Sequence, residues 1–173
     1  MTTAYLGSIQ YYQRLLRKGA AFDFSVPFRR GQGMNSCCID SPDGMLKLSI
    51  PVVNPHKVTP VGEILISEHG NWRHRHWNAL ASSYRQTPYF DYYEEDFRPF
   101  YERHDWERLV DFNADLHRTI VRLLSIPDCT IQDQAAIRQE PYYQLFAPRH
   151  GFIPNLSIVD LLFNMGPESV YWL

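Results

Sequence analysis

The sequence predicts an α/β fold in which helices flank a small mixed sheet. Residues 3–9 form a β-prone run, and the helix formers of Ile9–Lys18 follow directly. Apolar and polar residues then alternate over 21–28, as in a strand with one buried face. This β–α–β order favours a parallel strand pair joined by a crossover helix. Because helical patterns cluster over 71–125, an α+β arrangement is the alternative.

The first helix is predicted by apolar spacing over Ile9–Lys18. Tyr12, Leu15 and Leu16 recur three and four residues apart, which indicates one buried helix face together with Tyr11. Gly19 is typical of a helix end.

A hairpin is predicted over residues 36–53. Its turn is Ser41-Pro42-Asp43-Gly44, where proline presets φ and glycine tolerates a positive φ. We expect strands over 36–40 and 45–53, and further short strands over 62–67 and 130–132.

Two helical stretches carry the strongest patterns in the second half. Residues 109–123 give an amphipathic helix, after helical segments over 71–84 and 89–104. The last helix spans Ser157–Asn164 and is apolar almost all round, which predicts burial. Ser157 and Asp160 have the spacing of a capping box.

Composition bounds the class of protein. The chain has 173 residues, with 17 basic and 19 acidic side chains and a net charge of −2, so we expect one domain over 1–173 that does not bind nucleic acid. Since no secretory leader and no apolar run of membrane-spanning length is apparent, we expect a cytoplasmic protein without a membrane span. The three cysteines are an odd number and show no paired metal-site spacing. We expect no cofactor.

The densest group of chemically active side chains lies over residues 69–76. His69, His74 and His76 lack a recognised ligand spacing, so no metal site is predicted. Arg73 and Arg75 interleave with them near a predicted helix start, where a phosphate or carboxylate would be attracted. A solvated charged face is the alternative.

Other candidates have structural explanations as well. Asp160 and Asn164 share one face of a buried helix, so Asp160 needs either a ligand or a structural hydrogen bond. Cys37 or Cys38 would be a nucleophile if a neighbouring cation lowered its pKa, but buried structural cysteines are the favoured interpretation.

Three segments together resemble the WbqC-like family of bacterial proteins. The first is Tyr5-Leu6-x-Ser8-Ile9-Gln10-Tyr11-Tyr12. The second is His69-Gly70-Asn71-Trp72-Arg73-His74-x-His76-Trp77-Asn78, continued by Tyr84-x-x-x-Pro88-Tyr89-Phe90-x-Tyr92-Tyr93. The third is Tyr143-Gln144-x-Phe146 with Gly151-Phe152-x-Pro154-Asn155-Leu156-Ser157-Ile158-x-Asp160-Leu161-Leu162-Phe163-Asn164-x-Gly166-Pro167-Glu168.

The resemblance implies a setting rather than a mechanism. Members of the family are associated with surface polysaccharide and O-antigen genes, and transfer of an acyl or aminoacyl group to a sugar has been suggested for some. The family pattern has arginine after the asparagine of Met34-Asn35, where this chain has Ser36. The segment 130–141 is also shorter than in the family, so part of a pocket wall is expected to be missing.

These observations combine into one predicted site for a small-molecule substrate, such as a nucleotide sugar or an acyl or aminoacyl donor. His76 is the predicted general base, and Asp160 is predicted to orient it or the donor. The predicted ligand-binding residues are Gln10, Asn35, Arg73, His74, Asn155 and Asn164. The alternatives are a non-catalytic binding or assembly protein of the same pathway and a nucleotide-dependent enzyme.

Overall fold

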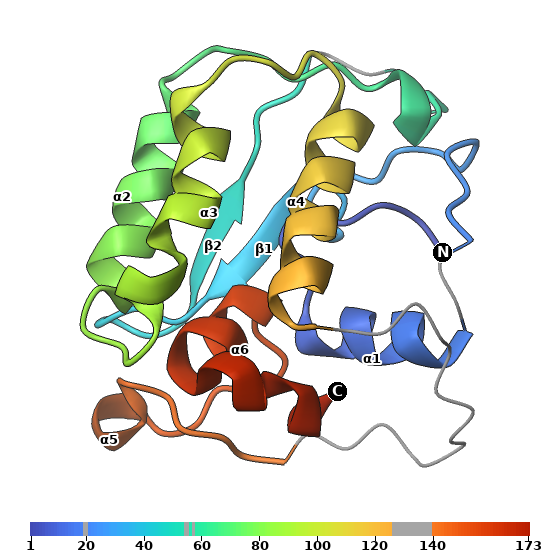
Figure 1. Cartoon of the computed structure of the whole chain (residues 1–173). Helices are drawn as coiled ribbons and strands as arrows, with labels where there is room; N and C mark the ends of the chain where they lie inside the picture. Colours follow the sequence, from blue (N-terminus) through green and yellow to red (C-terminus); the bar gives the residue numbers. More distant parts are fainter. Residues whose placement is uncertain (19–20, 54–55, 57, 126–139) are drawn as a thin grey trace.

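The architecture is known from a computed structural model that describes residues 1–18, 21–53, 56, 58–125 and 140–173. Helices α2, α3 and α4 stand beside a small hairpin, with α1 and α6 below them in the view of Figure 1. The helices are α1 (Ile9–Lys18), α2 (Trp72–Tyr84), α3 (Phe90–Glu102), α4 (Leu109–Leu123), α5 (Ala147–His150) and α6 (Ile158–Met165). The other elements are β1 (Ser36–Ile39), β2 (Leu46–Ser49) and the 3₁₀ helices η1 (Val61–Glu63) and η2 (Gly166–Trp172).

The helices confirm the predicted apolar patterns. α1 has the predicted bounds, with Leu15 and Leu16 buried, and α4 buries Phe112, Leu116 and Ile120 against the core. Aromatic rings fill much of this core. Most of the aromatic residues of α3 are buried in it, so their rings are not free to stack on a ligand.

The predicted hairpin is also confirmed. β1 and β2 pair antiparallel, and Cys37 faces Leu48 on the buried side while Cys38 faces Lys47 on the other. Gly44 closes the turn with a φ of 98°, a conformation that glycine adopts without strain.

The expected parallel strand pair is wrong. The residues that the structure describes form one sheet, which is the antiparallel β1–β2 pair. Ser8 and Pro27 make only isolated bridges, to Ser157 and Pro60. Residues 62–67 do not form a strand either. The first of them belong to η1, and the later ones make only isolated bridges. The prolines explain part of this result, because a proline nitrogen has no hydrogen to donate to a ladder. The strand predicted at 130–132 lies outside the described residues.

A set of hydrogen bonds, here called the clasp, joins residues 6–9 to residues 156–158. The Ile158 amide donates to Gly7 O at 2.8 Å, the Ile9 amide to Leu156 O at 3.0 Å, and the Ser157 hydroxyl to Leu6 O at 2.8 Å. The clasp sets α6 against the start of α1.

Helix α6 is buried as predicted, with all of Ile158–Asn164 inside the protein. Its capping box is incomplete: Ser157 Oγ accepts from the Val159 amide, but the Asp160 side chain does not bond back to the Ser157 amide, which donates to Cys38 O. Asp160 is engaged elsewhere, as described below.

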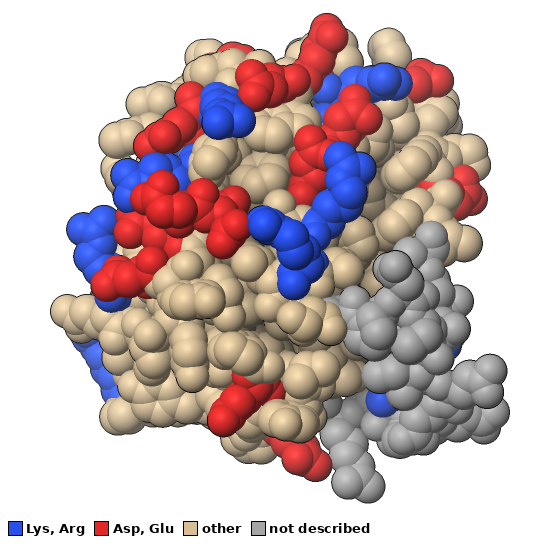
Figure 2. Space-filling model, viewed as in Figure 1, with Lys and Arg blue, Asp and Glu red and all other residues tan. Residues whose placement is uncertain are grey.

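The α/β class, with helices around a small sheet, is confirmed. None of the helices in the described ranges is long and apolar enough to cross a membrane. On the face in Figure 2, basic and acidic side chains alternate rather than separate into patches, and Arg98 and Arg122 form ion pairs with Glu94 and Asp96.

Gly166 lies where a side chain has no room. Its φ is 57°, and a Cβ there would lie 2.4 Å from the Tyr89 ring. We predict that Gly166→Ala lowers the free energy of unfolding by roughly 2 kcal/mol or more, since overpacking adds to backbone strain. Urea denaturation measures the loss. Gly44→Ala is the matched control, because φ is positive there too but no atom lies within 4 Å. Equal losses in the two variants would contradict the proposed steric cause.

Candidate functional site

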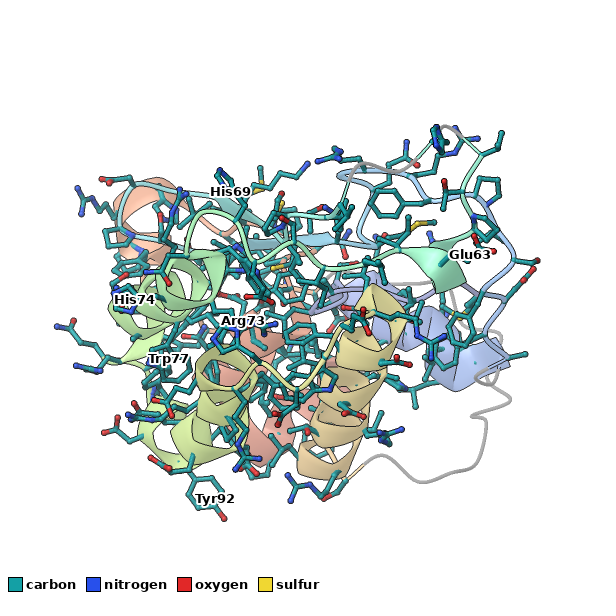
Figure 3. All side chains as sticks on the ribbon, turned by 90° about the horizontal axis from the view of Figure 1, so that it is seen from above. Glu63, His69, Arg73, His74, Trp77 and Tyr92 are labelled. Carbon is teal, nitrogen blue, oxygen red and sulfur yellow. The ribbon has the colours of Figure 1, made fainter. Side chains whose placement is uncertain are left out.

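Arg73, predicted to hold an anion, is held by the protein itself. Its guanidinium donates to Glu68 Oε1 at 2.8 Å and to Phe100 O at 3.1 Å, and it stacks over the Trp72 ring at 4.5 Å. Figure 3 shows it directed into the interior from α2. Arg73 therefore ties α2 to α3 and to the preceding loop.

His74 and His76 lie on different sides of α2. His74 is exposed on the outer side (Figure 3), where Asn78 Nδ2 donates to its Nε2 at 2.9 Å. His76 is buried, and its Nδ1 shares a hydrogen bond of 2.9 Å with the Tyr5 hydroxyl, which also bonds to Tyr101. Burial lowers the pKa of His76 to about 4, so the imidazole is neutral at pH 7.

Asp160 is the centre of a buried hydrogen-bond network. Its Oδ1 accepts from the Tyr84 hydroxyl at 2.8 Å, while its Oδ2 accepts from the Tyr142 hydroxyl and from Gln144 Nε2. Burial raises the pKa of Asp160 to about 6 despite these donors. In the predicted site Asp160 would orient either His76 or the donor, and in the structure its side-chain hydrogen bonds go to Tyr84, Tyr142 and Gln144.

A second carboxylate lies on the same network. The Asp40 amide donates to the Tyr84 hydroxyl at 3.0 Å, and Asp40 Oδ1 lies 3.1 Å from Nε2 of His150. Burial raises the pKa of the Asp40 carboxyl as well. Asn164 is also buried, and its amide donates to Asp160 O at 2.8 Å within α6. These contacts are those of a packed polar interior.

Asn35 has a structural position as well. It is buried, accepts from the Gly31 amide at 3.0 Å and donates to Ile50 O at 2.8 Å. It therefore fixes the turn that precedes β1 to the end of the hairpin.

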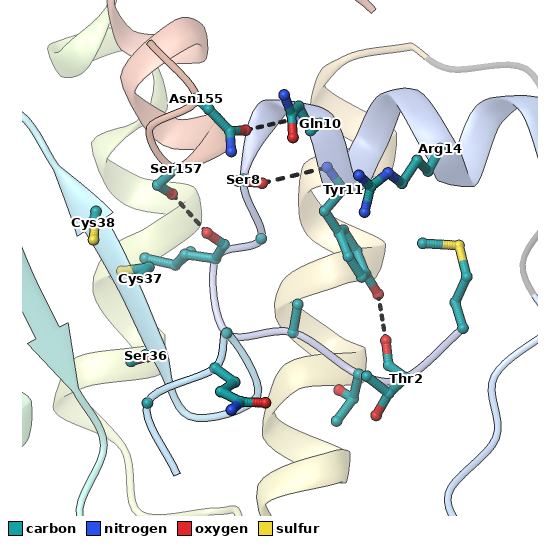
Figure 4. A pocket seen from close by; sticks show the side chains of 18 of the residues that line it. Thr2, Ser8, Gln10, Tyr11, Arg14, Ser36, Cys37, Cys38, Asn155 and Ser157 are labelled. Atoms are coloured by element: carbon teal, nitrogen blue, oxygen red, sulfur yellow. Dashed lines mark hydrogen bonds between the residues drawn. The ribbon is translucent and has the colours of Figure 1, made fainter. Parts of the chain in front are cut away.

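Gln10 and Asn155 are the two predicted ligand-binding residues that line a pocket. Asn155 has a φ of 55°, and its Oδ1 accepts from the Gln10 amide at 3.1 Å. The pocket, here called the α1 pocket, has a volume of about 370 Å³ and lies between α1, the N-terminal segment and the hairpin (Figure 4). Its lining residues are Met1–Ala4, Leu6–Ser8, Gln10, Tyr11, Arg14, Gly31–Gly33, Ser36–Cys38, Lys47, Asn155 and Ser157.

The α1 pocket is positively charged. Arg14 and Lys47 line it and are exposed, and no Asp or Glu is present among the described lining residues. Arg14 extends from α1 back toward Tyr11 (Figure 4), and Lys47 Nζ donates to Gly31 O at 3.1 Å. The first amides of α1 are already bonded, so an anion here would be held by side chains rather than by the helix end.

The pocket also contains Ser36 and the half-buried Cys38. Ser36, the position at which the resemblance implies an arginine, lies in this wall. Cys37 is buried, and burial raises the pKa of its thiol well above the usual value. Both cysteines are among the lining residues, but Cys37 is buried and agrees with the structural interpretation, whereas Cys38 is the more exposed of the two. Cys129 lies outside the described residues.

The structure thus separates the predicted residues. Gln10 and Asn155 line the α1 pocket, with Asn35 beside it, whereas Arg73, His76 and Asp160 are buried away from its lining. Arg14, Lys47 and Cys38 also line the pocket, although no sequence pattern marks them as pocket residues. Lys47 and Cys38 were recoverable in principle, because cross-strand partners in a hairpin share a face. Among the residues with described positions, no three His, Cys, Asp or Glu side chains gather as a metal ion requires.

Comparison with protein families gives one match. The family model described as the WbqC-like protein family covers residues 4–141, which include the lining of the α1 pocket except Met1–Thr3, Asn155 and Ser157. The chain belongs to the WbqC-like protein family. No curated protein and no solved structure gives a significant match to this WbqC-like chain. The roles assigned above to its side chains therefore remain predictions.

We predict that replacing Asp160 makes stability rise with pH. Between about pH 4 and 6 the native Asp160 carboxyl binds a proton that the same carboxyl has lost in the unfolded chain. The contribution of Asp160 to the free energy of unfolding therefore falls as pH rises, by roughly 3 kcal/mol over this range. His76 acts in the opposite direction over nearly the same range, because the unfolded imidazole binds a proton that the native one does not. In Asp160→Asn only the His76 contribution remains of the two, so the free energy of unfolding rises with pH over this range.

The matched variant is His76→Asn, which leaves the Asp160 contribution and should make stability fall as pH rises from 4 to 6. Urea denaturation of both variants and the parent chain over this range gives the slopes. The same slope in both variants would show that these two groups do not control the pH dependence.

Proposed function

We propose that this WbqC-like protein is a cytoplasmic transferase of surface-polysaccharide biosynthesis that binds an anionic substrate in the α1 pocket. The substrate would be a nucleotide sugar or an acyl or aminoacyl donor that carries phosphate. The observation that carries the proposal is the pairing of Arg14 and Lys47 around a pocket without a described carboxylate. Arginine and lysine are the side chains that most often bind phosphate in proteins.

The polar lining would supply specificity. The side chains of Gln10 and Asn155 provide amide groups in the lining of the same pocket, and the volume of about 370 Å³ is within the usual range of small-molecule sites. Because Ser36 stands where the family pattern has arginine, binding of the anion in this member would depend on Arg14 and Lys47.

The second candidate is a binding or assembly protein that does not turn over a substrate. It is favoured by the burial of His76, which is 6% exposed, and of Asp160, which is 0% exposed. A general base must come within hydrogen-bonding distance of the proton it removes, and these two groups bond to protein atoms instead. The catalytic roles predicted for His76 and Asp160 stay predictions.

We predict that the combined variant Arg14→Gln/Lys47→Gln binds UDP-glucose or coenzyme A at least about tenfold more weakly, since a hydrogen bond to a charged group contributes about 1.5–3 kcal/mol. Isothermal titration calorimetry measures the affinities. Arg103→Gln is the control, because Arg103 is exposed at the end of α3 and is not in the pocket. If the double variant binds both ligands as tightly as the parent chain, the anion site is elsewhere.

Turnover separates the two candidates. If a bound donor is converted to product with a sugar acceptor, the transferase assignment is supported. The rates of His76→Asn and Asp160→Asn, measured where binding is retained, then test the catalytic roles predicted for these two residues. Binding without product across a panel of sugar acceptors would favour the binding protein.

A further inference from the structure

A second hollow lies between the C-terminal half of α2 and the segment that leads into α5. This hollow, here called the α2 groove, has a volume of about 540 Å³ and is separate from the α1 pocket, with which it shares no lining residue. In Figure 1, α5 lies just beyond the C-terminal end of α2. The lining residues are Pro42, Asn78, Ala81, Ser82, Arg85, Gln86, Leu145 and Phe146.

One wall of the groove is the outer face of α2. Asn78, Ser82 and Arg85 are spaced four and three residues apart, so they share one helix face, and all three are exposed. Asn78 Nδ2 is held by its hydrogen bond to His74, which leaves its carbonyl oxygen for another partner. His74 was predicted as a ligand-binding residue, and in the structure it positions a residue of this groove.

The opposite wall is fixed by hydrogen bonds beneath it. Gln144 bonds through its side chain to both the amide and the carbonyl of Ile153, and it also donates to Asp160. His150, at the end of α5, lies 3.1 Å from Asp40 Oδ1 and packs its ring against Phe146. Phe146 is therefore a half-buried aromatic ring on a wall that is already ordered without a ligand.

The charge of the groove is positive. Arg85 is the one charged residue in its described lining. Amide and hydroxyl side chains line the groove together with the arginine and the Phe146 ring. Amides and hydroxyls bind the hydroxyl groups of a sugar, an aromatic ring packs against its C–H face, and arginine binds an anion.

We propose that the α2 groove binds a monosaccharide that carries one anionic group. Arg85 would bind the anion, Phe146 would pack against the ring, and Asn78, Ser82 and Gln86 would bond to its hydroxyl groups. The anion is either a carboxylate or a phosphate. This assignment does not depend on the α1 pocket, because the two hollows have no residue in common.

The test is an NMR titration of isotope-labelled protein with glucuronic acid, glucose 1-phosphate and glucose. We expect at least one of the two acids to shift the amide signals of residues lining the groove and to bind about tenfold more tightly than glucose. Arg85→Gln should weaken that acid about tenfold and leave glucose unchanged. Phe146→Leu should weaken all sugars that bind, since it removes the aromatic face but keeps an apolar side chain.

Two controls separate this site from the α1 pocket. Arg14→Gln/Lys47→Gln and Arg103→Gln should bind the acid as the parent chain does. Failure of both acids to shift groove signals, or equal affinity in Arg85→Gln and the parent chain, would overturn the proposal. Loss of binding in the Arg14/Lys47 variant alone would assign the sugar to the α1 pocket and overturn it too. The ratio of the two acids identifies the anion.

Discussion

The clasp between residues 6–9 and 156–158 is the contact on which the rest of the structure depends. Three hydrogen bonds of 2.8–3.0 Å fix the start of α1 to the start of α6. The Ser157 amide adds a bond to Cys38 O, so β1 is held at the same point. Because backbone groups buried there have no access to water, each must be paired within the protein. The clasp satisfies these groups and at the same time builds one side of the α1 pocket.

The buried polar groups show why residue type alone does not distinguish a binding residue from a structural one. Arg73 is predicted to hold an anion and His76 and Asp160 to act in catalysis, yet each bonds to protein atoms inside the core. Burying a charge costs free energy unless the charge is paired, so each buried charge needs a partner from a neighbouring segment. Those partners, such as Glu68 and Tyr84, are visible only once the helices are packed.

Local patterns predicted the local elements well. The bounds of α1, the hairpin with its turn, the three long helices and the burial of α6 all follow from periodicity and turn residues. The absence of the parallel pair and of a strand over 62–67 does not follow from these patterns, because pairing depends on which segments meet in space. Residues 6–9 bond to the start of α6 instead of to a strand. Gln10 and Asn155, which were predicted to bind a ligand, both line the α1 pocket, whereas Arg14 and Lys47 look like ordinary surface charges in the sequence.

The clasp also has a consequence for how the molecule assembles. Ser157 bonds to Leu6 across 151 positions of sequence, and Asn155 bonds to Gln10 across 145. Contacts this distant in sequence form late, since a long loop must close before they contribute any stabilisation. During synthesis the wall of the α1 pocket therefore cannot form until residues 155–158 have been added to the chain. A nascent chain released before residue 155 would contain Arg14 and Lys47 but no complete pocket around them.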